Sequence, residues 1–122
     1  MKKAWLFIGL VVVSLMAGCT AVKTYTDEGR AIDVGVGRDF VIALGSNPST
    51  GYGWQEAYDA SALELVSQTY KPAQKDVIGS GGVEYLRFRA LKAGSTEVTL
   101  SYQRPWETEA ISRKVFTVTV RD

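Results

Sequence analysis

Apolar residues alternate with polar or smaller ones along several short runs of the chain, with the period of two that marks a strand buried on one face. The clearest runs lie at residues 39–44, 85–90, 98–102 and 116–120, and weaker ones at 32–36, 52–57 and 63–70. Gly, Pro, Ser and Asn separate the runs, and only residues 59–66 leave room for a helical period. Six or seven strands in roughly 90 residues predict an all-β domain, an antiparallel sandwich of about seven strands.

The candidate core residues are large side chains on these runs. They are Phe40, Trp54, Phe88, Tyr102 and Phe116, and each can bury about 150–250 Å². The chain has one Cys, so no disulfide within the chain can cross-link the sandwich. Its stability must therefore come from apolar packing, and the length predicts a single domain.

The first 19 residues are typical of an export signal. Lys2 and Lys3 precede an apolar run from Ala4 to Val13, and small residues follow. The run is shorter than the ~20 apolar residues that span a bilayer. A membrane-anchor helix with an incidental Cys, or an ordinary signal cut nearby, are the alternatives.

The end of this segment, Leu15–Cys19, resembles the lipobox of bacterial lipoproteins. The resemblance implies that residues 1–18 are removed, that the Cys19 thiol carries a diacylglycerol, and that the new amino group is acylated. Residues 19–31 would then be the lipidated Cys and a polar tether, and residues 32–122 the folded domain. The polar leader itself runs from Thr20 to Arg30.

The expected location is the cell envelope, with the protein exported and held by its acyl chains. Thr20 is not the aspartate that retains similar lipoproteins in the inner membrane, so the outer membrane is expected for a Gram-negative source. Removing Lys2 and Lys3 lowers the 14 basic residues to 12, against 13 acidic ones. Anchoring would therefore depend on acyl chains rather than on attraction to anionic lipid.

Composition narrows the function further. The chain has no His, one Cys and a formal net charge of +1. This excludes catalysis through a Ser-His or Cys-His pair, and no cofactor, metal or nucleic-acid partner is expected. The carboxylate pairs Glu107 with Glu109, and Asp27 with Glu28, are typical of solvated surface, so an enzyme is the least favoured class.

Three connections between predicted strands have a composition that suits binding. They are Ser46-Asn47-Pro48-Ser49-Thr50-Gly51, Gly79-Ser80-Gly81-Gly82 and Arg104-Pro105-Trp106-Glu107. Pro stiffens a loop, Gly lets backbones approach closely, and exposed Trp and Arg are enriched at binding hot spots. Taken singly, each also fits an ordinary turn, and Trp106 could fold back over the sandwich edge with Arg104 stacked on it. Because alternate connections emerge at one end of such a sandwich, we expect the three loops to form one surface.

The three loops, in this order and at similar spacing, resemble the motifs of the chagasin-like inhibitors of papain-type cysteine peptidases. The likeness rests on Asn47–Trp54, Gly79–Gly82 and Arg104–Trp106, and extends from about Asp33 to Val120. It implies an immunoglobulin-like sandwich whose loops enter the peptidase cleft as a wedge.

The resemblance also implies a role for each loop. Pro48–Gly51, preceded by Asn47, would cover the catalytic cysteine of the peptidase, with Thr50 nearest to it. Gly79–Gly82 would lie on the unprimed side of the cleft, and Arg104–Trp106 would pack on the primed side against an enzyme aromatic residue. Many relatives have Thr where this chain has Ser49. That difference bears on affinity more than on the mode of binding.

The expected function is reversible inhibition without chemistry. A pre-shaped loop that offers no carbonyl in attack geometry can fill the cleft, and no acyl-enzyme then forms. The expected partners are a papain-family cysteine peptidase and, through the acyl chains on Cys19, a membrane, with the chain itself a monomer. The alternative is a lipid-anchored immunoglobulin-like envelope or adhesion module without inhibitory activity, with Trp106 and Tyr102 available to bind a sugar.

Overall fold

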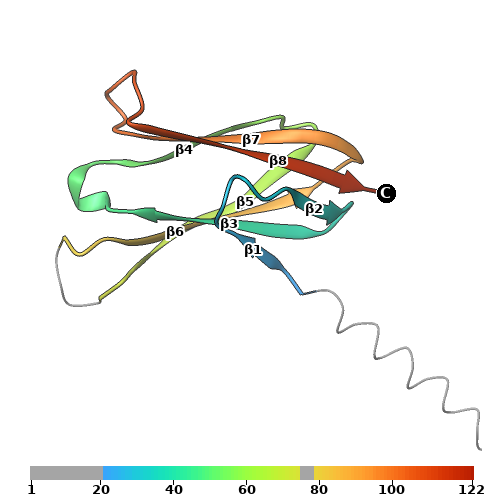
Figure 1. The fold of residues 1–122 in the computed structure, drawn as a ribbon, viewed down its shortest axis with the longest axis horizontal. Coiled ribbons are helices and arrows are strands. Elements are labelled where there is room, and N and C mark those ends of the chain that lie inside the picture. The colour runs from blue at the N-terminus through green and yellow to red at the C-terminus, as the bar shows by residue number, and fades with distance from the viewer. Residues whose placement is uncertain (1–20, 75–78) are drawn as a thin grey trace, which may run out of the picture.

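The computed structural model describes residues 21–74 and 79–122, which form two four-stranded sheets packed face to face (Figure 1). One sheet has the strand order β1-β3-β6-β5 and the other β2-β8-β7-β4. The strands are β1 (Lys23–Tyr25), β2 (Ile32–Gly35), β3 (Asp39–Ser46), β4 (Gly53–Tyr58), β5 (Leu63–Pro72), β6 (Gly82–Ala90), β7 (Gly94–Gln103) and β8 (Ser112–Arg121). One turn of 3-10 helix, η2 (Pro48–Thr50), lies between β3 and β4.

The predicted all-β sandwich is confirmed, with two differences at its edges. The leader at residues 20–30 contains β1, which pairs in parallel with β3 from Lys23 opposite Phe40 to Tyr25 opposite Ile42. The sandwich therefore begins before residue 32, inside the segment expected to be a polar tether. In addition, β2 pairs in parallel with β8, so each sheet has one parallel pair at its edge and is antiparallel elsewhere.

Residues 59–66 form a turn and the start of β5. The Asp59 carboxylate accepts hydrogen bonds from the N–H and the hydroxyl of Ser61, at 2.9 and 2.7 Å. This local competition for backbone hydrogen bonds favours a turn over a helix, and β5 then begins at Leu63, which is fully buried.

The core lies between the two sheets and is built from the alternating positions. The large side chains Phe40, Phe88 and Phe116 are almost fully buried. Phe40 stacks on Phe88 with ring centroids 5.5 Å apart. Trp54 is also buried, and Tyr102 is half-buried against the same cluster. The predicted core residues are therefore confirmed.

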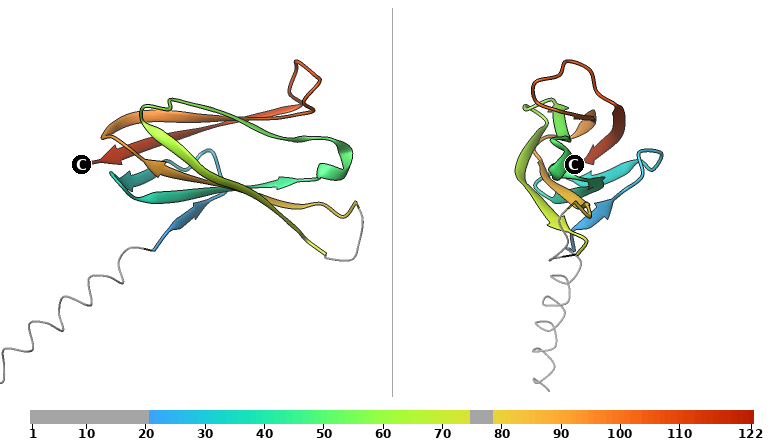
Figure 2. Two further views of the ribbon diagram at one scale, coloured as in Figure 1. Left: turned by 180° about the vertical axis from the view of Figure 1, so that it is seen from behind. Right: turned by 90° about the vertical axis from the view of Figure 1, so that its left-hand side faces the viewer.

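The two ends of the sandwich differ in what they carry. The β3–β4, β5–β6 and β7–β8 connections emerge at one end, which we call the loop end (Figure 2). The β2–β3, β4–β5 and β6–β7 turns and the end of β8 lie at the other, which we call the turn end. Among the residues that the structure describes, none forms a helix with the length and hydrophobicity needed to cross a bilayer.

Candidate functional site

The three predicted loops meet at the loop end, as expected for connections that alternate along the chain. The β3–β4 loop contributes Asn47–Gly51, the described part of the β5–β6 loop contributes Gly79–Gly81, and the β7–β8 loop begins at Arg104. Side-chain hydrogen bonds join the first of these loops to each of the other two. The loops therefore form one connected surface.

The β3–β4 loop is held in shape by its own hydrogen bonds. Asn47 caps the 3-10 turn, because its Oδ1 accepts hydrogen bonds from Ser49 N at 3.3 Å and Ser49 Oγ at 2.6 Å. The Thr50 hydroxyl donates to the Asn47 carbonyl at 2.7 Å. Gly51 ends the turn at φ 88°, in the left-handed region that favours glycine. Ser49 and Thr50 are exposed, and their hydroxyl protons are already used within the loop.

The β5–β6 loop is tied to the first loop through Asn47. The Nδ2 of Asn47 donates to the carbonyl of Gly79 at 3.1 Å. At Gly82 a Cβ would overlap the backbone carbonyl oxygen of Lys71 on the facing strand β5. Any larger residue would clash where β6 begins, and this steric limit explains the glycine at position 82.

A shallow groove of about 220 Å³ separates the first two loops. Its lining combines the Asn47–Ser49 and Gly79–Ser80–Gly81 backbones with two side chains of β5, Tyr70 and Pro72. The surface of the loop end is therefore not flat, because the β3–β4 and β5–β6 loops border a groove.

The β7–β8 loop is tied to the first loop through Arg104. Its Nε donates to the Thr50 carbonyl at 3.1 Å, and its guanidinium lies 4.4 Å from the ring centroid of Tyr52. The Arg104 guanidinium also forms an ion pair with Glu107 at 3.7 Å. These contacts fix the start of the loop against the neighbouring one.

Trp106 is the most exposed of the large hydrophobic side chains in the described part of the chain, at 70% exposure. One edge of the ring approaches Gly51, where a Cβ would lie 3.2 Å from Cη2. Arg104 lies 5.9 Å from the Trp106 ring, further than from Tyr52. The cation–π contact with Arg104 that the fold-back alternative includes is therefore present, while most of the Trp106 ring stays exposed rather than packed over the sandwich edge.

Two aromatic residues below the loops complete the site. Tyr102 lies between Tyr52 and Trp54, with ring centroids 5.3 and 4.9 Å away, and its hydroxyl accepts the Asn47 N–H at 2.9 Å. Trp54 Nε1 donates to the carbonyl of Gly45 at 2.9 Å. The sequence predicted both rings as core and missed the Tyr102 hydroxyl, although a half-buried tyrosine at a strand end usually needs a polar partner.

The site offers an exposed contact surface, and its motif residues include neither Cys nor His. In the described ranges 21–74 and 79–122, no cluster of His, Cys, Asp or Glu could hold a metal ion. Its exposed features are a tryptophan, small hydroxyls and glycine backbone. Such a set suits the recognition of another protein.

The architecture defines the class of protein: an immunoglobulin-type sandwich that presents three interlinked loops at one end. Residues 33–120 match the model of the chagasin family of peptidase inhibitors, family I42. This match covers well over half of the chain, so the chain belongs to that family. The family indicated by the three loop motifs is confirmed.

Individual relatives agree with this assignment. The chain is 33% identical to chagasin of Trypanosoma cruzi over 101 residues, covering 78% of this chain and 91% of chagasin. It is 28% identical to amoebiasin-2 of Entamoeba histolytica over 123 residues, covering 98% and 99%. The crystal structure of the cysteine protease inhibitor EhICP2 from Entamoeba histolytica superposes with a TM-score of 0.68 at 26% identity, covering 82% of this chain and 97% of that one.

Proposed function

We propose that this chain inhibits papain-type cysteine peptidases by filling the active-site groove with its loop end. The proposal rests on one observation: side-chain hydrogen bonds from Asn47 and Arg104 join the three family motifs to one another. A wedge that is already shaped loses little conformational entropy on binding, where each newly ordered side chain would cost about 0.5–1.5 kcal/mol. The similarity to EhICP2, a cysteine protease inhibitor, supports the choice of peptidase class.

In this proposal each loop keeps the role implied by the family. Pro48–Gly51 covers the catalytic cysteine, Gly79–Gly82 lies on the unprimed side, and Arg104–Trp106 packs on the primed side. Asn47 acts differently from the other motif residues. Because its side chain is engaged with Ser49 and Gly79, it shapes the wedge more than it touches the peptidase.

The mechanism is occupancy. The 3-10 turn at Pro48–Thr50 curls the backbone away from the extended form that a peptide substrate adopts. The Thr50 carbonyl, which would face the enzyme in a substrate-like strand, instead accepts the hydrogen bond from Arg104. Because its oxygen is held within the inhibitor, this carbonyl does not enter the oxyanion hole that an attacked carbonyl must occupy, and the inhibitor leaves intact.

The test is a titration of papain and of a cathepsin-L-like enzyme with the purified protein, followed with a fluorogenic peptide. We expect complete loss of activity, recovery on dilution, and an inhibitor of unchanged mass. Trypsin, a serine peptidase, serves as the control and should be unaffected. Full papain activity at micromolar inhibitor would contradict the proposal and favour a non-inhibitory envelope module.

We also propose that Cys19 carries the lipid anchor and that the protein is held at the cell envelope. Cys19 and the signal segment 1–18 lie outside the described residues, so the support is the lipobox-like sequence alone. We expect Cys19→Ser to abolish labelling with a radioactive fatty acid and to prevent removal of the signal. Labelling that persists in Cys19→Ser would contradict the anchor, since Cys19 is the only Cys in the chain.

A further inference from the structure

The first strand of the sandwich lies close in sequence to the proposed anchor. β1 begins at Lys23, four residues after Cys19. Four residues span at most about 14 Å even when fully extended, at 3.3–3.6 Å each. A domain attached this closely cannot move far from its anchor.

The start of β1 lies at the turn end. β1 runs parallel to β3, and Lys23 is opposite Phe40, the second residue of β3. The loop end comes only after β3 has run on to Ser46. We propose that the turn end is a membrane-facing surface that lies against the lipid headgroups, so that the three loops point away from the bilayer. This inference rests on the proposed lipid anchor at Cys19.

The turns of this end form one connected unit. The β2–β3 turn bonds to β6, since Gly37 N donates to Ala90 O at 2.8 Å and Ala90 N donates to Arg38 O at 2.9 Å. Val36 N donates to Arg121 O at 2.9 Å, which joins the same turn to β8. Because backbone hydrogen bonds hold these turns together, they present one rigid face.

Exposed apolar side chains and cations gather on that face. Val22, Val36 and Leu91 are among the exposed large hydrophobic residues, at 39%, 41% and 42% exposure. Lys23 and Arg38 form no ion pair among the described residues. Aliphatic tips flanked by Lys and Arg suit the interface between headgroups and acyl chains.

Two acidic residues near this end, Asp39 and Asp33, are paired with arginines of the domain, whereas Asp59 in the β4–β5 turn and Asp122 form no ion pair among the described residues. Asp39 lies between Arg87 and Arg89, at 2.7 and 2.8 Å. The hydrogen bond from Arg89, more than the other contacts, holds the pKa of Asp39 below its ordinary value, so the carboxylate stays charged and paired. Asp33 pairs with Arg121 at 2.6 Å. Repulsion from anionic lipid is thereby reduced.

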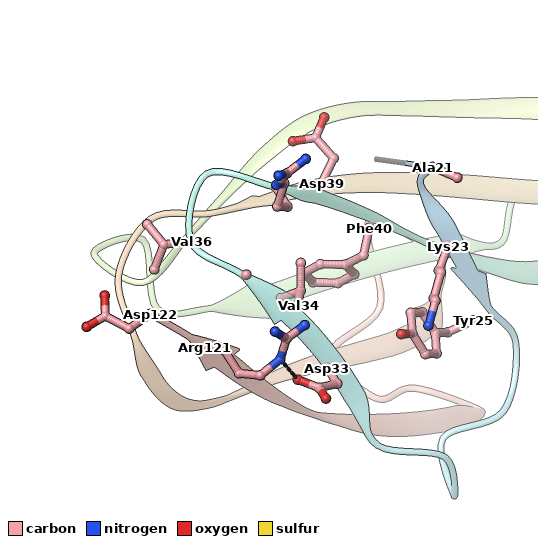
Figure 3. Close-up of a pocket in the computed structure, with 12 residues that line it drawn as sticks. Ala21, Lys23, Tyr25, Asp33, Val34, Val36, Asp39, Phe40, Arg121 and Asp122 are labelled. Atoms are coloured by element: carbon pink, nitrogen blue, oxygen red, sulfur yellow. Dashed lines mark hydrogen bonds and ion pairs between the residues drawn. The ribbon is translucent and has the colours of Figure 1, made fainter. Parts of the chain in front are cut away.

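A cleft opens on the same end between the edge strands β1 and β2 (Figure 3). Its volume is about 520 Å³, and Val34 and Phe40 lie within it beside the Asp33–Arg121 ion pair. Lys23 and Arg38 also line it. The cleft therefore sets Lys23, Arg38 and Arg121 among the carboxylates of Asp33, Asp39 and Asp122, over two largely buried apolar side chains. It opens next to Ala21, the first residue that the structure describes.

The orientation has a functional consequence. β3 alone has eight residues, so the loops stand about 25 Å beyond the turn end at ~3.3 Å per residue. A peptidase bound at the loop end would then avoid the bilayer. The acyl chains supply the affinity for the membrane in this arrangement, and the turn end sets the angle of the domain.

The experiment places a tryptophan at each end of the lipidated full-length protein in vesicles. Leu91→Trp changes a turn-end residue that is 42% exposed, and Ile111→Trp changes a residue of the β7–β8 loop that is 64% exposed, so both substituted positions are open to solvent. Quenching by lipids brominated on their acyl chains is compared with that of the unsubstituted protein. We expect about half of the emission added by Leu91→Trp to be quenched, because interfacial residues sit at the headgroup and acyl boundary, and none of that added by Ile111→Trp.

Equal quenching of the two added tryptophans, or stronger quenching at Ile111→Trp, would overturn the orientation. Flotation of the same vesicles separates this result from failure of the anchor. If the unsubstituted protein does not float with the vesicles, the lipid anchor is wrong and the orientation falls with it. If it floats and Leu91→Trp is not quenched, the anchor stands and only the orientation is wrong. Neither outcome bears on the proposed inhibition of papain, which is tested separately with the protein in solution.

Discussion

Trp106→Ala should weaken inhibition of papain by about 30-fold or more, the equivalent of roughly 2 kcal/mol lost at a hot spot. The side chain is 70% exposed in the free protein, so its large apolar surface becomes buried only on binding. For the same reason the free energy of unfolding should hardly change. The measurements are the inhibition constant and the midpoint of thermal unfolding for the variant and the unsubstituted protein.

Ile111→Ala is the matched control for this prediction. Ile111 belongs to the same β7–β8 connection and is 64% exposed, but it lies outside the Arg104–Trp106 motif. We expect its inhibition constant to stay within a few-fold of the unsubstituted value. Should Trp106→Ala lower the unfolding midpoint by several degrees, Trp106 would be a structural residue and its assignment as the affinity anchor would be wrong.

Most of the fold could be predicted from the sequence because most strands are half-buried and pair in antiparallel fashion. Phe88 and Phe116 sit at alternate positions of long strands, so the period of two is visible without a structure. β1 was not predicted because it has only three residues, of which Tyr25 alone is buried. A strand that short has no period, and its parallel pairing depends on a contact with β3 that no local pattern encodes.

The candidate site was predicted residue by residue, and its connections were not. Glycine and proline indicate a turn through their backbone conformations, and an exposed tryptophan indicates a binding surface, so these residues can be recognised one at a time. The bond from Asn47 to Gly79 joins residues 32 positions apart, and the bond from Arg104 to Thr50 joins residues 54 apart. Such pairings arise only when the sandwich brings the loops together, so the sequence alone could not distinguish three separate turns from one preorganised wedge.

Asn47→Ala should weaken inhibition about as strongly as Trp106→Ala, for a different physical reason. The substitution removes the cap of the 3-10 turn, typically worth ~1 kcal/mol. It also removes the hydrogen bond to Gly79, worth about 0.5–1.5 kcal/mol. Together these losses correspond to a factor of roughly 30 in the inhibition constant. Because both bonds belong to the folded protein, the unfolding midpoint should also fall by several degrees, which is the readout that distinguishes this variant from Trp106→Ala.

Asn47→Asp separates the two contributions. An aspartate keeps an acceptor for the Ser49 N–H and hydroxyl, but it has no donor for the Gly79 carbonyl. We expect its inhibition constant to lie between those of the unsubstituted protein and Asn47→Ala. An inhibition constant for Asn47→Asp equal to the unsubstituted value would show that the link between the two loops adds nothing to binding.

The rate constants should distinguish a residue that shapes the wedge from one that contacts the enzyme. If Asn47 keeps the loops in their binding form, Asn47→Ala lowers the fraction of molecules ready to bind, and the association rate falls by that fraction. Losing a contact, as in Trp106→Ala, mainly raises the dissociation rate. Stopped-flow or surface-plasmon measurements on both variants give the two rates. A pure increase in dissociation for Asn47→Ala would mean that Asn47 binds the peptidase directly and that the preorganisation of the wedge lies in its other bonds, chiefly those of Arg104 and Tyr102.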